Sequence, residues 1–430
     1  MTEDRHVLRE IAWQEVFPGL MLFSAWKIAI SLRALVLASL GVLATSLGWM
    51  LVDYVFEVPK QQSIVNAWLP ALPSFQPGVV HDRATNEPAS LIPLESKDFR
   101  IDRQQPTDGP GAWWIANPIV DAWSSLTLPF KYAFATGLSG SQFGYFSACA
   151  LWALVVWAYF GGAITRLAAV QLTREEKLSW GQTLGYARSK WPSYFAAPLF
   201  PMFGVVLAAI PLAVVGLMIY VGGLGTAVAG VLWPLVLFAG FVMAILLVGL
   251  FFNWPLMWPT ISTEGTDSFD ALSRSYAYSF QRPLRYAGYL FVLAVIGVLS
   301  WLLVRVFAGG VLMLSQWAVE RGSGLELQNL LINREKLEGF DWFGTTLIYR
   351  CNQLVGLIAR GFVFSYFFVG ATAVYLLLRL HVDATETDEV FLSDEDDPRG
   401  LPPLAMDSAG VVQVADVPAG GGHGNVSPEG

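Results

Sequence analysis

Four basic residues lie in two similar stretches of the chain, each just ahead of a long apolar run. They are Arg188, Lys190, Arg282 and Arg285. Lys and Arg close to tryptophan and tyrosine at a membrane surface attract the phosphates of anionic lipids. The sequence therefore predicts that these side chains contact lipid headgroups. The alternative is structural, because the same charges could stabilise the C-terminal ends of short helices or pair with nearby carboxylates. The candidate carboxylates are Glu175, Glu176 and Asp270.

The other chemically reactive residues show no catalytic or metal-binding spacing. Cys149 and Cys351 lie about two hundred positions apart without a CxxC pair, and such spacing predicts neither a zinc nor a haem site. The histidines are scattered outside the apolar runs, at positions 6, 81, 381 and 423. We expect no enzyme activity, metal or cofactor. An enzyme would have to use the carboxylates of residues 53–144, namely Asp82, Asp98, Asp102 and Asp108.

The composition indicates what must position these residues. Of 430 residues, 54% are hydrophobic and 14% are charged, and the mean hydropathy is +0.50. A helix needs about twenty apolar residues to cross a bilayer. Six stretches meet that condition and contain no Asp, Glu, Lys, Arg or His, so we expect an all-α integral membrane protein. These stretches are residues 34–52, 145–164, 195–221, 227–252, 286–304 and 361–378.

The distribution of Lys and Arg predicts the orientation. Residues 1–33, 165–194 and 253–285 carry twelve basic residues, a higher density than in the longer connections on the other side. The positive-inside rule then predicts that both termini lie on the cytoplasmic side of a bacterial inner membrane. The expected organisation has five parts. They are an interfacial helical segment 1–33, a first span 34–52, a Pro-rich extracytoplasmic loop 53–144, a membrane domain 145–382 with spans two to six, and a tail 383–430.

Three segments outside the spans have distinct compositions. The many prolines of residues 53–144 predict a loop without long regular elements. Residues 311–338 mix leucines with charged residues, which is typical of amphipathic helices lying flat on the outer surface or packing across the ends of the spans. Residues 383–430 carry a net charge of −10 and too few apolar side chains to offset chain entropy. We expect a disordered acidic tail, either a docking arm for a basic partner or a solvated end.

A parallel internal repeat precedes three spans. Ser179 with Gln182 has the spacing of a capping box, and Asp267 with Asp270 is an acidic variant of it. Each cap is expected to start a helix along the inner interface, and Pro192 and Pro283 are then expected to turn the chain into the bilayer. The prolines within 195–221 favour either a discontinuous helix around a substrate path or a kinked hairpin. Asn253 could line a pocket near this hairpin.

The repeat also resembles a known family. Its clearest residues are Ala271, Leu272, Ser275 and Tyr276, followed by the apolar run from Tyr286. Over about residues 165–305 the chain resembles the membrane domain of the glycerophosphoryl diester phosphodiesterase membrane-domain family and related bacterial multispan proteins. In that family a separate soluble domain performs the hydrolysis, and no part of this chain matches it. The resemblance thus implies the membrane architecture and no catalysis.

These observations favour one function and leave a second open. The first is a noncatalytic scaffold or accessory subunit of a bacterial membrane assembly. The second is a permease or lipid-handling protein, indicated by the repeat and by the prolines of the third span. The expected partners are membrane lipids, other membrane proteins or a basic partner for the tail, and we expect no nucleic acid. Intramembrane ionisable residues, which mark ion-coupled transport, are missing from the predicted spans.

Overall fold

Helices form nearly all of the structure. The computed structural model describes residues 18–58, 63–65, 117–135, 137–324, 326–333, 336–385 and 389–391. Of these described residues 89% are helical, and none of them is in a strand. The predicted all-α membrane fold is confirmed.

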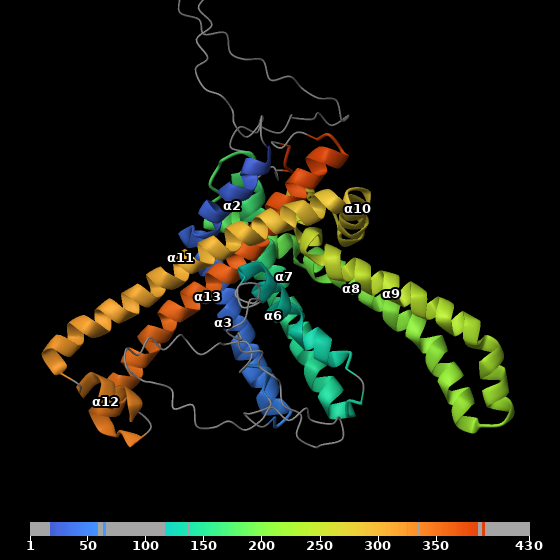
Figure 1. Cartoon of the computed structure of the whole chain (residues 1–430), viewed down its shortest axis with the longest axis horizontal. Coiled ribbons are helices and arrows are strands. Elements are labelled where there is room, and N and C mark those ends of the chain that lie inside the picture. The colour runs from blue at the N-terminus through green and yellow to red at the C-terminus, as the bar shows by residue number, and fades with distance from the viewer. Residues whose placement is uncertain are drawn as a thin grey trace, which may run out of the picture. The chain divides into compact units, whose positions relative to one another are not determined.

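The helices follow one another with short connections, apart from the segment between α3 and α6 (Figure 1). In chain order they are η1 (Pro18–Leu20), α2 (Met21–Ala29), α3 (Leu32–Val55), α6 (Pro118–Ala133), α7 (Gly140–Thr173), α8 (Trp180–Val221), α9 (Leu224–Glu264), α10 (Ser268–Gln281), α11 (Pro283–Ser323), α12 (Glu326–Ile332) and α13 (Gly339–Val382).

Six of these helices are long and apolar enough to cross a membrane. They are α3, α7, α8, α9, α11 and α13, and each contains one of the six predicted stretches. Four of them have 41 to 44 residues, which corresponds to a length of about 60 Å or more. That is roughly twice the hydrocarbon thickness of a bilayer. An upright helix of this length would extend well beyond the membrane. Each of these helices therefore contains residues in addition to those needed to cross the bilayer.

One end of the long helices packs into a hub, which we define as α2, α10 and the adjoining parts of α7, α8, α9, α11 and α13. The C-terminal half of α13 lies at its centre, and the most apolar 18-residue window of that helix is 100% buried. Phe368 stacks on Trp258 with ring centroids 5.3 Å apart. Gly161 admits both rings, since a Cβ there would lie 2.5 Å from Trp258. The hydrophobicity of this window therefore serves packing within the protein.

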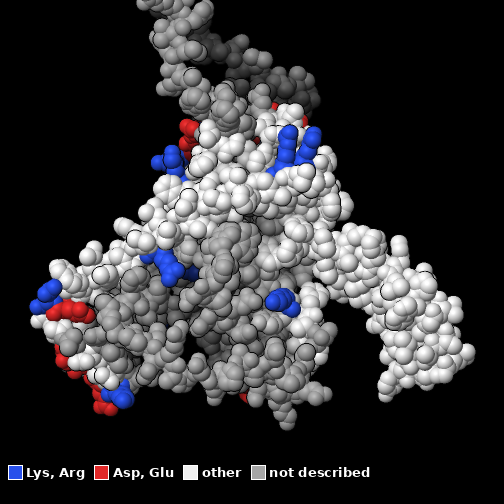
Figure 2. Space-filling view, viewed as in Figure 1, with Lys and Arg blue, Asp and Glu red and all other residues white. Residues whose placement is uncertain are grey.

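Outside the hub, α8 and α9 form a hairpin arm, which we define as residues 199–249. Gly222 and Gly223 make the turn at its tip with positive φ angles of 75° and 53°, a conformation that suits glycine. Only 6% of the most apolar window of each helix is buried. Residues 191–263 contain no Asp, Glu, Lys or Arg, and the arm is free of charge in Figure 2. Its exposed surface suits contact with lipid or with other membrane proteins.

The prolines of α8 do not interrupt it. Pro192, Pro198, Pro201 and Pro211 all lie inside the helix, so α8 does not end at Pro192, where a turn was predicted. Of the two alternatives for the third span, the structure has the hairpin, with its turn at Gly222 and Gly223, and not the discontinuous helix. A proline removes only one backbone donor, and neighbouring helices hold the helix around it. Next to Pro192, the Trp191 Nε1 donates to the carbonyl of Val155 on α7 at 3.1 Å. The predicted break at Pro283 is confirmed, because α10 ends at Gln281 and α11 begins at Pro283.

Helix α6 corrects the prediction that residues 53–144 lack long regular elements. Its N-cap Asn117 accepts a hydrogen bond from the Ile119 N–H at 2.9 Å, and Pro118 stands in the first turn, where a missing donor costs little. The helix starts beside the first third of α11, since Asn117 Nδ2 donates to the Ala294 carbonyl at 3.0 Å. It ends where Tyr132 stacks on Phe146 near the start of α7. The end of α3 lies there as well, since the Tyr145 hydroxyl donates to Asp53 at 2.7 Å, so α6 runs from α11 toward this end, as a re-entrant helix would.

The segment 311–338 also differs from the prediction. Helix α11 continues to Ser323, and only the short α12 is a separate helix. Residues 311–323 are therefore an extension of a span, because no proline interrupts the run after 304. Most of the predicted loop 53–144 and tail 383–430, together with residues 1–17, lies outside the described residues. Residues 389–391 are described and pack onto the hub, as shown below.

Candidate functional site

The four predicted headgroup residues all lie at the hub. Arg188, on α8, is exposed, as are Arg282 and Arg285 at the junction of α10 and α11. Lys190 is different, because its Nζ donates to the carbonyl of Gly265 just after α9. The ammonium of Lys190 thus lies at the C-terminal end of the long helix α9, and headgroup contact by these four residues stays a prediction. Asp270, one of the suggested carboxylate partners, binds Arg274 on its own helix instead, at 3.0 Å.

The C-terminal end of α9 is the point on which the polar groups of the hub converge. The last four carbonyls of a helix have no partner within it. The Ile261 carbonyl accepts from the Gly265 N–H at 3.0 Å and from the Tyr186 hydroxyl at 2.7 Å. The Ser262 carbonyl accepts from Arg166 at 2.8 Å. Other helices therefore satisfy this helix end, and their cations oppose the negative end of its dipole.

Arg166 on α7 is the most deeply buried charge of this site, with 0% of its surface exposed. Besides Ser262, its Nη1 donates to the carbonyl of Phe391 at 2.7 Å. Its guanidinium lies over the Tyr186 ring, 4.0 Å from the centroid, which is a cation–π contact. Sequence patterns do not reveal this role, because Arg166 lies two residues after the predicted second span, in the connection that follows it.

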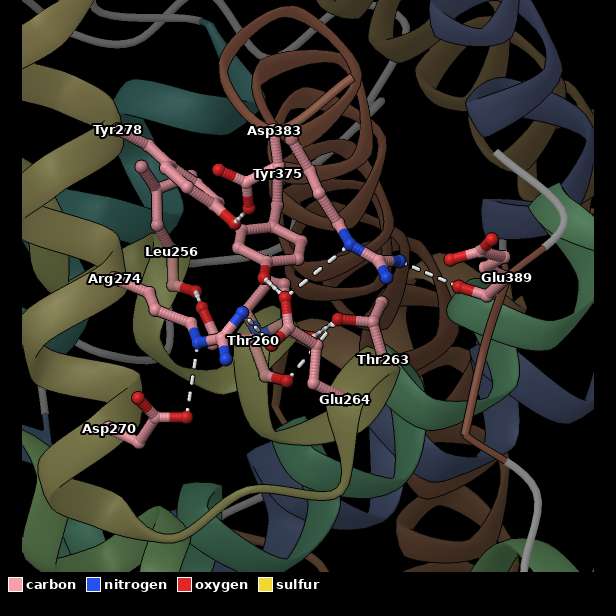
Figure 3. A network of polar contacts seen from close by, with 12 residues as sticks. Leu256, Thr260, Thr263, Glu264, Asp270, Arg274, Tyr278, Tyr375, Asp383 and Glu389 are labelled. Carbon is pink, nitrogen blue, oxygen red and sulfur yellow. Dashed lines mark hydrogen bonds and ion pairs between the residues drawn. The ribbon is translucent and has the colours of Figure 1, made fainter. Parts of the chain in front are cut away.

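Glu264, the last residue of α9, links three helices (Figure 3). Its carboxylate lies 2.6 Å from Arg274 Nη1 on α10 and 3.5 Å from Arg379 Nε on α13, although only 8% of the Glu264 side chain is exposed. It also accepts a hydrogen bond from the Tyr375 hydroxyl. Burial by itself lowers the pKa of Arg274, but the carboxylates of Glu264 and Asp270 outweigh that effect and raise this pKa above its ordinary value. The guanidinium stays charged.

A tyrosine adds a second carboxylate to this network. The Tyr278 hydroxyl on α10 donates to Asp383, just beyond α13. Burial raises the pKa of Tyr278, and the hydrogen bond to Asp383 and the charge of Glu264 raise it further. The hydroxyl therefore remains a donor throughout the physiological pH range, and it ties α10 to the end of α13 (Figure 3).

Residues 389–391 dock against this network as an extended segment. The Phe391 N–H donates to the Thr263 carbonyl of α9 at 2.8 Å, and Arg379 Nη1 donates to the Glu389 carbonyl at 2.6 Å. Val390 is buried, with 7% of its surface exposed. The Phe391 ring lies where a side chain at Gly265 would be, 2.6 Å from the position of a Cβ. The start of the predicted tail is therefore part of the folded hub.

The cleft beside this segment has a volume of about 500 Å³. Its charged lining residues are Arg174, Glu264, Arg274, Arg379 and Glu389. Arg274 pairs with Glu264 and Asp270, and Arg379 contacts Glu264 and the Glu389 carbonyl. The charges that line the cleft are therefore largely paired with one another. Among the residues that the structure describes, no three His, Cys, Asp or Glu side chains are grouped so as to hold a metal ion.

A second polar site joins α6 to α13 below the hub. Arg360 Nη1 forms an ion pair with Asp121, and its Nη2 donates to the Ser125 hydroxyl at 2.8 Å. The side chain of Arg360 is 9% exposed and that of Asp121 is 32% exposed. Arg360 directly precedes the predicted sixth span, and Asp121 lies in the predicted loop, so the sequence did not bring them together. The residues proposed for an enzyme site, including Asp82 and Asp102, lie outside the described residues.

Asn253, expected as a pocket residue between spans, lies inside α9 instead. It is 1% exposed, and its Oδ1 has no hydrogen-bond partner within the described part of the chain. It does not line the cleft beside residues 389–391. A buried amide with an unsatisfied oxygen lowers stability, and the structure gives no physical account of its presence.

No protein-family model, curated protein or solved structure matches this chain. The resemblance of residues 165–305 to the phosphodiesterase membrane-domain family therefore stays a prediction. What the geometry establishes is a multi-pass helical protein with a charged network at one end of its bundle.

Proposed function

We propose that this protein is a noncatalytic membrane scaffold or accessory subunit, in which the hub holds the hairpin arm out for contact with other membrane components. The observation that carries the proposal is the contrast in burial, 6% for the apolar windows of α8 and α9 against 100% for that of α13. The apolar side chains of α13 serve internal packing, whereas those of the arm, with the higher mean hydropathies of 2.6 and 2.9 against 1.9, are left open.

The arm presents small residues that its own fold does not use. Gly240 and Ala244 are both exposed, and a Cβ at Gly240 would meet no atom within 4 Å. In contrast, Ala158 is buried, and a Cβ at Gly162 would lie 2.7 Å from Tyr194. Small residues let helices in a membrane approach closely. The pair on α7 serves internal packing, and the pair on α9 is open to a partner helix.

The arrangement of charge supports a bacterial inner membrane with the hub in the cytoplasm. By their positions along the chain, Arg174, Arg188 and Arg285 lie in or next to the connections at the hub end of the helices. Because basic connections are retained on the cytoplasmic side, this distribution favours a cytoplasmic hub and an outward-facing tip of the arm.

Photocrosslinking in native membranes tests the scaffold proposal. A benzophenone amino acid replaces Phe241 on the arm, and a matched control replaces Phe307 on α11; the two side chains are 61% and 73% exposed. We expect protein adducts from position 241 and lipid adducts alone from position 307. Gly240→Leu should reduce the protein adducts, because it blocks close helix approach. Lipid adducts alone from both positions would contradict the proposal.

A permease or lipid-handling role is the second candidate, and the re-entrant helix α6 favours it. The ion pair of Asp121 and Arg360 lies near the first turn of that helix, and charged residues within membrane spans often mark a transported substrate's path.

The test of this second candidate combines two measurements. Vesicles should show lipid or solute flux that Asp121→Asn abolishes. Replacement of all four predicted headgroup residues by Gln should remove retained anionic lipids in native mass spectrometry. Absence of both effects would leave the scaffold role.

A further inference from the structure

The hub surface at the end of α9, formed by Arg166, Thr263, Gly265 and Arg379, holds residues 389–391 through their main chain. One N–H of the segment donates to the hub, from Phe391 to the Thr263 carbonyl at 2.8 Å. Two of its carbonyls accept from guanidinium groups, Phe391 from Arg166 at 2.7 Å and Glu389 from Arg379 at 2.6 Å. Hydrogen bonds to backbone groups give affinity for an extended segment, and side-chain pockets give selectivity.

Two side chains of the segment meet the hub in different ways. Val390 is buried, with 7% of its surface exposed. The Phe391 ring packs against Gly265, where φ is +67° and a Cβ would clash with the ring, while 47% of Phe391 stays exposed. The Glu389 side chain is exposed. The hub surface thus suits a segment with a valine followed by an aromatic residue that packs on glycine.

Release of the segment uncovers groups that α9 does not satisfy by itself. The Thr263 carbonyl would lose its partner, and Arg166 would keep its bond to the Ser262 carbonyl but lose the one to Phe391. The Arg166–Phe391 bond is partly buried and the Arg379–Glu389 bond is exposed, so water can take the place of the segment. Release therefore costs the net value of these hydrogen bonds and not a full desolvation penalty.

We propose that this hub surface is a peptide-docking site whose resident ligand is the chain's own segment 389–391, and that release of the segment opens the site to a partner segment with a valine followed by an aromatic residue. The contacts carry this proposal independently of the scaffold role of the arm. Helix α13 ends at Val382, so only six residues join it to the segment. A linker this short gives the chain's own segment an effective concentration of about millimolar at the site. A competing segment of equal affinity must be present above that concentration to displace it.

The experiment uses the full-length chain in detergent and a labelled synthetic peptide of residues 386–395. The variant Val390→Asp places a charge in the buried position and releases the chain's own segment. We expect saturable binding of the peptide to this variant, measured by fluorescence anisotropy. The unmodified full-length chain should bind the peptide at least tenfold more weakly, because its own segment competes. A chain that ends after Asp388 provides a second open form.

Two modified peptides test the contacts separately. A peptide with N-methyl phenylalanine at position 391 lacks the donor to the Thr263 carbonyl. Its affinity should be lower by a factor of about ten. A peptide with Asp at position 390 should not bind measurably. Equal binding of all three peptides, or no saturable binding to either open form at millimolar peptide, would overturn the proposal. Intermolecular crosslinks between position 391 and Gly265 of separate chains would also overturn it, because the resident segment would then come from a second copy.

Discussion

Replacement of Arg166 by methionine is the sharpest test of how the hub is held together. Methionine keeps most of the apolar stem and removes the guanidinium. The change deletes two charge-assisted hydrogen bonds, at 2.8 Å to Ser262 and 2.7 Å to Phe391, and a cation–π contact at 4.0 Å with Tyr186. A bond to a charged group contributes about 1.5 to 3 kcal/mol, and the cation–π contact contributes about 1 to 2 kcal/mol.

The net effect is smaller than the sum of these contributions, because the variant no longer has to desolvate a buried charge. We expect a loss of about 3 to 5 kcal/mol in the free energy of unfolding, in line with other broken buried charge contacts. The assay is unfolding in mixed micelles of mild detergent and sodium dodecyl sulfate, followed by tryptophan fluorescence. Arg188→Met is the matched control, because Arg188 is exposed on α8, and it should change stability by less than about 0.5 kcal/mol.

Arg166→Lys separates charge from geometry. The lysine ammonium keeps the charge, but it cannot reproduce the planar arrangement of guanidinium donors. We expect this variant to recover less than half of the lost stability. If the free energy of unfolding of Arg166→Met lies within about 1 kcal/mol of that of the unmodified chain, then the end of α9 does not depend on tertiary partners. The reasoning about its carbonyls would then be wrong.

Three further predictions concern other parts of the molecule. Asp121→Asn and Arg360→Gln should each destabilise the protein by about 2 to 4 kcal/mol, and the double variant by clearly less than the sum; strict additivity in a double-mutant cycle would show that the pair is not coupled. Burial raises the pKa of Tyr276 to about 12, so the folded state keeps a proton that the unfolded chain releases near pH 10, and stability should fall between pH 10 and 12. Tyr276→Phe should flatten that fall in pH-dependent unfolding, and an unchanged slope would contradict it. A cysteine at Glu176 should resist an impermeant thiol reagent in intact cells and one at Gln328 should react; the reverse pattern would invert the orientation.

The six spans and several helix ends were predictable from the sequence for simple reasons. An apolar stretch of about twenty residues has few alternatives to a helix in a membrane. The caps were equally local, because Ser179 accepts a hydrogen bond from the Gln182 N–H and Asp267 from the Asp270 N–H, as their spacing predicted. The turn at Gly222 follows from the same short-range rules.

Hydrophobicity alone could not distinguish the environment of each span. The apolar windows of α9 and α13 are both free of charge and both long enough to span, yet one is 6% buried and the other 100%. The more exposed window is the more apolar one, with a mean hydropathy of 2.9 against 1.9. Lipid and a protein interior both favour apolar side chains, so the presence of an apolar run does not by itself tell which of them surrounds a helix. Proline had a similar ambiguity. Pro192 was expected to turn the chain, but the packing of Trp191 against α7 keeps α8 continuous.

The candidate site was decided only by the tertiary structure. Arg166, the end of α9 and Phe391 come from distant parts of the chain, with 225 positions between Arg166 and Phe391. No periodic pattern links such residues, and each by itself looked like part of a solvated connection or tail. They meet because the carbonyls at the end of α9 need donors that a helix cannot supply to itself. That requirement is local, but only the packing of α7, α13 and the segment 389–391 determines which donors meet it.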